Sequence, residues 1–137
     1  MDNCIFCKII KGEIPSYKIY EDEFTYAFLD IADDYEAHTL VVPKTHCVNV
    51  LDCPADVMAH VMDTVQKICR HYVENCGYDG VNLANCSGAE AQQSVFHFHM
   101  HMIPRYEDDG VGIGWKMGEL SDADRDEILA KLKEDQQ

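Results

Sequence analysis

The segment Val95-Phe96-His97-Phe98-His99-Met100-His101-Met102-Ile103 holds three histidines at alternate positions, separated by large apolar residues. Strict alternation over this length is the period of a half-buried β-strand. The apolar positions are predicted to face a core, so the histidines should share one accessible face of the strand. The simpler interpretation is a polar strand face that happens to be histidine. With 7 His in 137 residues, such a row is improbable by chance, and a functional site is the better hypothesis.

Strand geometry limits what the three imidazoles can do together. At the usual rise of a strand, His97 and His101 are rooted roughly 13 Å apart. A zinc–nitrogen bond is only about 2.1 Å long, so one ion could not take all three side chains. The row must therefore divide its work among nucleophilic attack, proton transfer and metal binding, for which neutral imidazole is suited near pH 7. Beside an anionic group, such a row suggests phosphorus chemistry.

The composition indicates one ordinary globular domain, with 47% hydrophobic and 26% charged residues in 137. The formal net charge of −14 argues against a nucleic acid polymer or an anionic membrane as partner, although local amides and imidazoles could still hold a small nucleotide. The sequence shows neither a signal-peptide pattern nor an apolar run long enough to span a bilayer, so we expect a cytoplasmic protein. The seven cysteines are expected to be reduced thiols, and five of them to be buried or half-buried: Cys47, Cys53, Cys69, Cys76 and Cys86.

Hydrophobic periodicity and turn residues predict an α+β domain, with an antiparallel sheet of about five strands and one long helix packed on it. The predicted strands are Tyr17–Tyr20, Phe24–Asp30, His38–Pro43, Val81–Asn85 and the histidine segment. The long helix is opened by Pro54, stopped by Gly77, and carries an apolar stripe made of Val57, Met58, Val61, Met62, Val65, Ile68, Cys69 and Tyr72. Short helices are predicted over residues 3–11 and 122–134, the second capped by Ser121 with Ile128, Leu129 and Leu132 directed inward.

Several motifs in order give the chain a likeness to a known family. His97-Phe98-His99-Met100-His101-Met102-Ile103 matches the H-φ-H-φ-H-φ-φ signature of the histidine triad (HIT) nucleotide-binding proteins, where φ is an apolar residue. The similarity covers about residues 3–106 and looks like that of the Hint branch, of the prokaryotic, cysteine-bearing type. It also includes Cys4–Ile10, Ala27–Ile31, His38–His46 and Ile103–Arg105. The resemblance implies a single HIT domain over residues 1–137, a homodimer, and a C-terminal segment, 107–137, that reaches toward the partner's site.

The resemblance also implies a purine nucleotide site. Asp30, which from its position alone is a turn former, would accept hydrogen bonds from the ribose. The nucleobase pocket would be walled by apolar side chains that fit core packing equally well, namely Ile5, Phe6, Ile9, Phe28 and Ile31. The phosphate would be contacted by Asn85, Gln92, Gln93, Ser94, His99 and His101. Gln92 stands where the family commonly has glycine, and the loop before Ser94 is one residue longer than in the eukaryotic Hint pattern.

The function implied is nucleotide hydrolysis at the α-phosphate through a nucleotidyl-histidine intermediate, with purine nucleoside phosphoramidates as substrates. His99 would be the nucleophile and His101 would hydrogen-bond the phosphate. His38, whose bland interpretation is structural, would support that region, and Ser94 would help the leaving group depart. Two alternatives stay open: a dinucleoside polyphosphate hydrolase, and a nucleotide- or zinc-binding adaptor with incidental catalysis.

Cys4-x-x-Cys7 has the spacing of half a zinc site, although a lone pair of this kind can equally be two small packing residues. The resemblance implies a structural zinc ion held by Cys4, Cys7, His46 and His97. Two sulfurs and two imidazoles would close a tetrahedral shell with no position left for a catalytic water. The ion would pin the N-terminal helix to the histidine segment.

Overall fold

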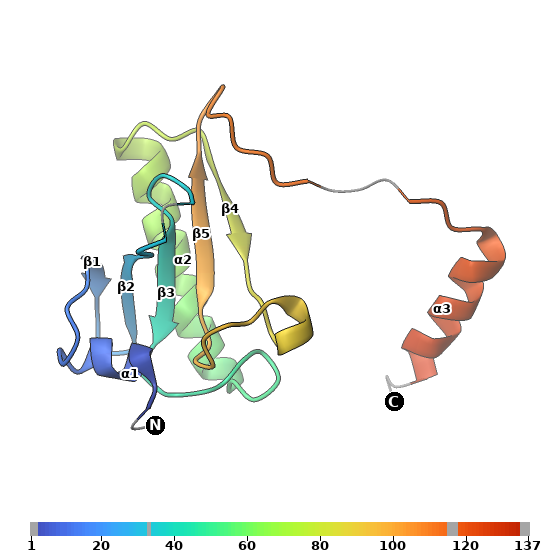
Figure 1. The fold of residues 1–137 in the computed structure, drawn as a ribbon, viewed down its shortest axis with the longest axis horizontal. Coiled ribbons are helices and arrows are strands. Elements are labelled where there is room, and N and C mark those ends of the chain that lie inside the picture. Colours follow the sequence, from blue (N-terminus) through green and yellow to red (C-terminus); the bar gives the residue numbers. More distant parts are fainter. Residues whose placement is uncertain (1–2, 33, 115–117, 135–137) are drawn as a thin grey trace.

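The structure, a computed structural model, describes residues 3–32, 34–114 and 118–134. Its centre is a five-stranded antiparallel sheet in the order β1-β2-β3-β5-β4. Figure 1 shows the long helix α2 behind this sheet, the short helix α1 in front of its lower end, and helix α3 standing apart at the C-terminus. The α+β class, the five strands and the two packed helices are as predicted from the sequence.

The first two strands, β1 (Lys18–Glu21) and β2 (Thr25–Leu29), form a hairpin whose turn is organised by one carboxylate. Asp22 accepts hydrogen bonds from the backbone N–H groups of Phe24 and Thr25, both at 2.8 Å, and from the Tyr20 hydroxyl at 2.8 Å. Burial raises the pKa of Asp22, but these bonds together outweigh it and lower the pKa to about 2. The turn therefore holds an ionised carboxylate across the ordinary pH range.

The inner strand β3 (Thr39–Pro43) pairs with both β2 and β5 (Met100–Arg105), and β4 (Gly80–Ala84) closes the sheet as its outer strand. The ladder between β3 and β5 runs only from Thr39↔Met102 to Val41↔Met100. Two residues further along β3 stands Pro43, which has no N–H to donate to a ladder. The predicted histidine strand therefore begins at Met100 rather than at residue 95.

Helix α2 (Ala55–Asn75) follows Pro54 and is succeeded by Gly77, which has a left-handed φ of +84°. The side chains that it buries against the sheet are Val61, Thr64, Val65, Ile68 and Tyr72. All of these except Thr64 belong to the larger core cluster, together with Ala27, Val41, Phe98 and Met102. Two details differ from expectation. Met62 is 45% exposed on the outer side of the helix, and Cys76, which ends it at the surface, is exposed.

Helix α1 (Ile5–Ile10) covers the opposite face of the sheet with Phe6 and Ile9. Its partners come from the alternate positions of β2 and β3: Tyr26, Phe28, Leu40 and Val42. His101 pairs with Leu40 across the ladder and so belongs to this same face. The expected division of the segment into an apolar and a histidine side is present, but the histidine side is covered: His97 is 0% and His99 5% exposed. Phe96, expected in the core, is 52% exposed because it precedes the strand.

Helix α3 (Asp122–Glu134) lies away from the sheet. Ser121 caps it as predicted, since the Asp124 N–H donates to Ser121 Oγ at 3.1 Å. The prediction that its apolar residues pack inward is wrong for this chain, because Ile128, Leu129 and Leu132 are 44–59% exposed. Within the described parts of the chain, no helix has the length and apolar character needed to cross a membrane.

Candidate functional site

His99 lies between the bend at residues 95–97 and the first residue of β5. In this region side chains form hydrogen bonds with the backbone carbonyls. Its Nδ1–H donates to the backbone carbonyl of His97 at 2.7 Å, and its own carbonyl accepts from the Asn85 side-chain amide at 2.9 Å. A neutral imidazole that donates from Nδ1 keeps a lone pair on Nε2. The local fold therefore sets both the orientation of His99 and the tautomer that a nucleophile needs.

His97 has the opposite tautomer to His99. Its Nε2–H donates to the backbone carbonyl of Pro43 at 2.8 Å, which leaves the lone pair on Nδ1. That atom lies 3.3 Å from Cys4 Sγ, 3.5 Å from Cys7 Sγ and 3.2 Å from His46 Nδ1. Adjacent histidines of the row thus use opposite nitrogens, and they point to different sites.

His97 and the three side chains around its Nδ1, those of Cys4, Cys7 and His46, could together hold a metal ion. Cys7 Sγ is also 3.4 Å from His46 Nδ1, and the four ligand atoms all lie within 4.8 Å of one another. A tetrahedral zinc ion with ordinary bond lengths would place two nitrogens about 3.3 Å apart and a nitrogen and a sulfur about 3.6 Å apart. The observed separations fit. The bond from His97 to Pro43 is the outer contact that typically orients a metal-bound imidazole.

His101 is joined to a pair of carboxylates through His38, which immediately precedes β3. His38 Nε2 is 2.9 Å from His101 Nδ1, while His38 Nδ1–H donates to Asp34 at 3.0 Å and lies 3.5 Å from Asp30. In the neutral pair His101 therefore donates to His38. One added proton, favoured by the carboxylates, would turn His101 Nε2 into a donor. The pair can thus present either an acceptor or a donor to a phosphate group.

Burial keeps the imidazoles of the row neutral. It lowers the pKa of His97 and of His101 to about 4 in each case, and it lowers the pKa of His99 as well. Hydrogen bonds to backbone carbonyls and the charge of Asp30 oppose this effect without cancelling it. At pH 7 the row therefore carries lone pairs rather than positive charges, as nucleophilic attack and metal binding require.

A cavity of about 280 Å³ opens beside His99 and His101, between α1 and β2. All five predicted apolar walls line it, together with Asp30 and Ser94. Phe6 stands edge-on to His99, with ring centroids 5.1 Å apart, and so joins the apolar wall of the cavity to this imidazole. Ile31 is 84% exposed and forms the rim. The sequence predictions missed six lining residues, namely Ile14, Pro15, Ser16, Leu29, Leu40 and Val95.

Three of the missed residues follow Gly12, whose φ of +80° turns the chain back after α1. This turn brings residues 14–16 over β2, where Ser16 Oγ is 2.7 Å from the Tyr26 hydroxyl. In the sequence, Gly12 and Pro15 indicate only that the helix predicted over residues 3–11 ends there. Whether residues 14–16 reach the pocket depends on the path of the chain after this helix.

The loop residues predicted to contact phosphate lie around the site rather than in the cavity. Asn85 holds the backbone of His99, as described above. Gln93 is buried, and its amide donates to the carbonyls of Val48 and Val95 at 2.7 and 3.1 Å and accepts from the Gly88 N–H at 2.8 Å. Gln92 is exposed, with a left-handed φ of 72°. Only Ser94 of this loop group lines the cavity.

Residues 11–108 match the model of the HIT domain. The chain belongs to the HIT domain family. This match spans the sheet, the long helix and the histidine row, and it is the family whose signature the His97–Ile103 segment carries. A relative from Candida albicans, named adenosine 5'-monophosphoramidase HNT1, is 39% identical over 142 residues, which cover 97% of this chain and 91% of the relative.

Solved structures of HIT proteins share the fold. A crystal structure of a HIT family member from Bacillus subtilis aligns with a TM-score of 0.85 at 44% identity, over 97% of this chain and 96% of that one. A zinc-bound histidine triad family protein from Mycobacterium smegmatis aligns with a TM-score of 0.77 at 36% identity, over 97% of each chain. The HIT fold of this chain therefore rests on both sequence and structure.

Proposed function

We propose that this HIT protein hydrolyses purine nucleoside phosphoramidates, cleaving the bond between the α-phosphorus and the amine nitrogen through a nucleotidyl-histidine intermediate on His99. The observation that carries the proposal is the orientation of His99. Its Nδ1–H is bound to the His97 carbonyl at 2.7 Å, while its ring lines a cavity that also contains Asp30 and Ser94. The name of the Candida albicans relative supports the same reaction class.

In the first half of the reaction, His99 Nε2 forms a bond to phosphorus as the phosphorus–nitrogen bond breaks. The departing nitrogen takes a proton through the Ser94 hydroxyl, which draws it in turn from solvent, and leaves as a neutral amine. In the second half, water attacks phosphorus, the bond to His99 breaks, and the proton of the water is released. The products are a nucleoside monophosphate and the amine, and His99 is restored. A nucleophile that divides one displacement into two is a recurrent means of catalysis.

The remaining site residues hold the substrate. The apolar cavity would take the purine, with Asp30 accepting hydrogen bonds from the ribose hydroxyls. His101, coupled to His38, would donate to a phosphate oxygen when the substrate's negative charge draws a proton to the pair. Asn85 and Gln93 would act by fixing the backbone around His99 and Ser94, since their amides are engaged by the protein itself.

A structural zinc ion belongs to this proposal, as does the prokaryotic Hint type. Cys4, Cys7, His46 and His97 would hold the ion, which would stiffen the junction between α1 and the histidine segment without entering the reaction. The tautomer of His97 and the 3.2–3.5 Å separations of the ligand atoms support it. The zinc-bound relative from Mycobacterium smegmatis is a HIT protein of the same fold.

We further propose that the whole of residues 1–137 acts as one HIT domain in a homodimer. β4 is an outer strand of the sheet, with Leu83 43% exposed, and α3 presents apolar residues away from its own sheet. A second copy would pair with or cover these elements. Sedimentation velocity of the full chain and of a form that ends at residue 114 would measure the contribution of α3 to the dimer.

The decisive experiment compares steady-state turnover of adenosine 5'-phosphoramidate with that of diadenosine polyphosphates, using protein purified without an affinity tag. We expect AMP release from the phosphoramidate at least 100-fold more efficient than from the polyphosphates, a difference of about 2.7 kcal/mol in transition-state stabilisation. Preference for the polyphosphate would point to the second hydrolase. Binding of AMP without turnover of either substrate would point to an adaptor.

A further inference from the structure

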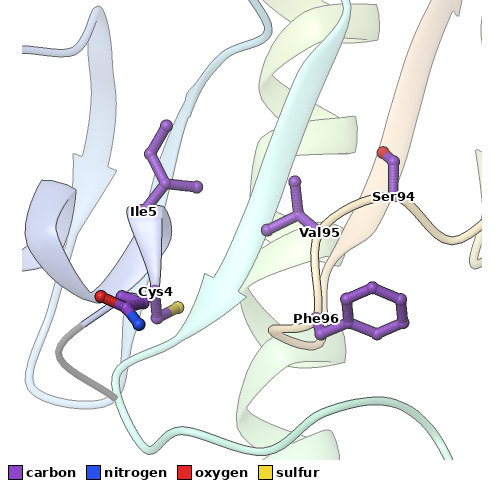
Figure 2. Close-up of a pocket in the computed structure, with 6 residues that line it drawn as sticks. Cys4, Ile5, Ser94, Val95 and Phe96 are labelled. Carbon is purple, nitrogen blue, oxygen red and sulfur yellow. The ribbon is translucent and has the colours of Figure 1, made fainter.

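A second cavity, of about 350 Å³, adjoins the nucleotide cavity. Figure 2 shows its two walls: Cys4 and Ile5, with Asn3 before them, at the start of α1, and Ser94, Val95 and Phe96 on the segment that leads into β5. Ile5, Ser94 and Val95 line both cavities, whereas His99 and His101 line only the nucleotide cavity. The two spaces therefore meet at Ser94.

The position of this junction decides which cavity the leaving group enters in an in-line displacement at phosphorus. The entering and leaving atoms lie on opposite sides of the phosphorus. With His99 attacking from within the nucleotide cavity, the leaving group points away from the imidazole. A group that departs past Ser94 enters the second cavity, which none of the three histidines lines.

We propose that this second cavity, lined by Asn3, Ile5, Val95 and Phe96 and joined to the nucleotide site at Ser94, is the subsite for the amine leaving group and selects neutral, largely apolar amines. The proposal rests on the proposed phosphoramidase function and adds the substrate class. Its volume is in the range of small-molecule sites.

The chemistry of the lining supports this class. Three side chains are apolar, and two are uncharged polar groups that can meet an amine or an amide. The sixth lining residue, Cys4, directs its sulfur to His97 Nδ1 at 3.3 Å. Among the described lining residues there is no lysine or arginine, the groups that normally hold a polyphosphate. In a chain of net charge −14, an anionic leaving group would also meet an unfavourable field.

Asn3 allows a test that leaves the catalytic groups untouched, because it is exposed and makes no contribution to the nucleotide cavity. The probes are adenosine 5'-phosphoramidates of 1,5-diaminopentane and of 6-aminohexanoate, which place opposite charges at the end of the same five-carbon linker. The parent phosphoramidate, whose leaving group is ammonia, does not reach the subsite. Asn75, an exposed residue in the last turn of α2, offers a control for the change in net charge.

We expect Asn3→Lys to raise kcat/KM for the carboxylate-bearing substrate and lower it for the ammonium-bearing one, and Asn3→Asp to do the reverse. The ratio of the two values should differ about tenfold between the variants at low salt and converge as salt is added. Turnover of the parent phosphoramidate should stay within about twofold of wild type in both. The matched pair Asn75→Lys and Asn75→Asp should leave the ratio unchanged.

A ratio that does not respond to Asn3, with turnover of all three substrates intact, would overturn the subsite and leave the phosphoramidase function standing. Equal shifts in the Asn75 pair would overturn it as well, because the effect would then come from total charge. Failure of wild-type protein to turn over any phosphoramidate would instead contradict the proposed function.

Discussion

His99 donates its Nδ1–H to the backbone carbonyl of His97, two residues earlier in the chain, at 2.7 Å. This bond orients the imidazole and reserves Nε2 for chemistry. The same stretch of backbone carries His97, whose ring faces the cysteines. One short segment therefore serves the reaction and the proposed metal site from neighbouring positions.

His99→Ala should abolish turnover of a nucleoside phosphoramidate, with a loss of at least about 10³-fold in kcat, because the proposed covalent intermediate forms on this imidazole. AMP binding should change little. His101→Ala should cost about 10²–10³-fold, the range for loss of one hydrogen-bond donor to charge that develops in the transition state. Acid-free quenching of wild-type reactions, followed by peptide mass spectrometry, should find the nucleotidyl group on His99. An adduct on His97 or His101 would overturn the assignment.

The free energy of unfolding should decrease in mild acid because of His101. Its pKa is lowered to about 4 in the folded protein, chiefly by burial, against an ordinary value of 6.5. As pH falls from about 6.5 to about 4, the unfolded chain binds a proton that the folded chain resists, so stability decreases over that window. His101→Gln should weaken this dependence. Thermal melts of both proteins at pH 7.5 and 5 would measure it, and an identical loss in the two would assign the effect to other groups.

The same lowered pKa predicts that activity persists below pH 6.5. The neutral row is the form needed before substrate binds. As pH falls through 6.5, kcat/KM should therefore stay level, and it should decline only at lower pH. A pH–rate profile with the parent phosphoramidate checks this. A break at 6.5 would show that the free enzyme's essential imidazole is ordinarily basic.

Asp30→Ala should weaken AMP binding by about tenfold, because two hydrogen bonds to the ribose are lost. Binding of the analogue that lacks both ribose hydroxyls should be almost unaffected. Asp34→Asn is the matched control, since Asp34 also bonds His38 but does not line the nucleotide cavity. Calorimetric titration of both ligands distinguishes the two roles. Equal losses for the two ligands in Asp30→Ala would assign that carboxylate to His38 alone.

Protein purified without a tag should contain close to one equivalent of zinc, and Cys4→Ala or Cys7→Ala should lose it. Because metal binding contributes folding free energy, each variant should melt at least about 5 °C lower, and a chelator should lower the melting temperature of the wild type similarly. Cys76→Ala, an exposed cysteine remote from the cluster, should do neither. Less than about half an equivalent of zinc, with melting unaffected by chelator, would remove the metal from the proposal.

Asn85→Ala should lower kcat by about tenfold with little change in KM for the parent phosphoramidate. Its amide donates to the His99 carbonyl at 2.9 Å, so its loss releases the backbone that carries His99, the proposed nucleophile. Ser87→Ala is a useful comparison, because Ser87 bonds the other end of the same amide at 2.7 Å. A large rise in KM with unchanged kcat would place Asn85 in direct contact with the substrate.

Local pattern in the sequence determined much of the fold. The period of two in residues 95–103 separated Phe98 and Met102, which lie in the larger core cluster, from His99 and His101, which line the cavity. Pro54 and Gly77 bracketed the long helix for reasons that act within a few residues of the chain. The resemblance then named the pocket walls, and all five line one cavity.

Three features were decided only by the tertiary structure. They are the covering of the histidine face of the sheet, the end of the ladder between β3 and β5, and the hydrogen bonds of the Asn85 and Gln93 amides. Helix α1 buries His97 and His99, a fact set by the chain's return over β2 after Gly12. Pro43 limits the ladder only because the register brings it near the histidine segment. Gln93 and Asn85 bind protein carbonyls that lie far from them in sequence or across a bend. Such contacts depend on distances between segments, and periodicity along one segment carries no information about those distances. For the same reason, the resemblance could place Cys4 and Cys7 beside His46 and His97, whereas their spacing in the sequence could not.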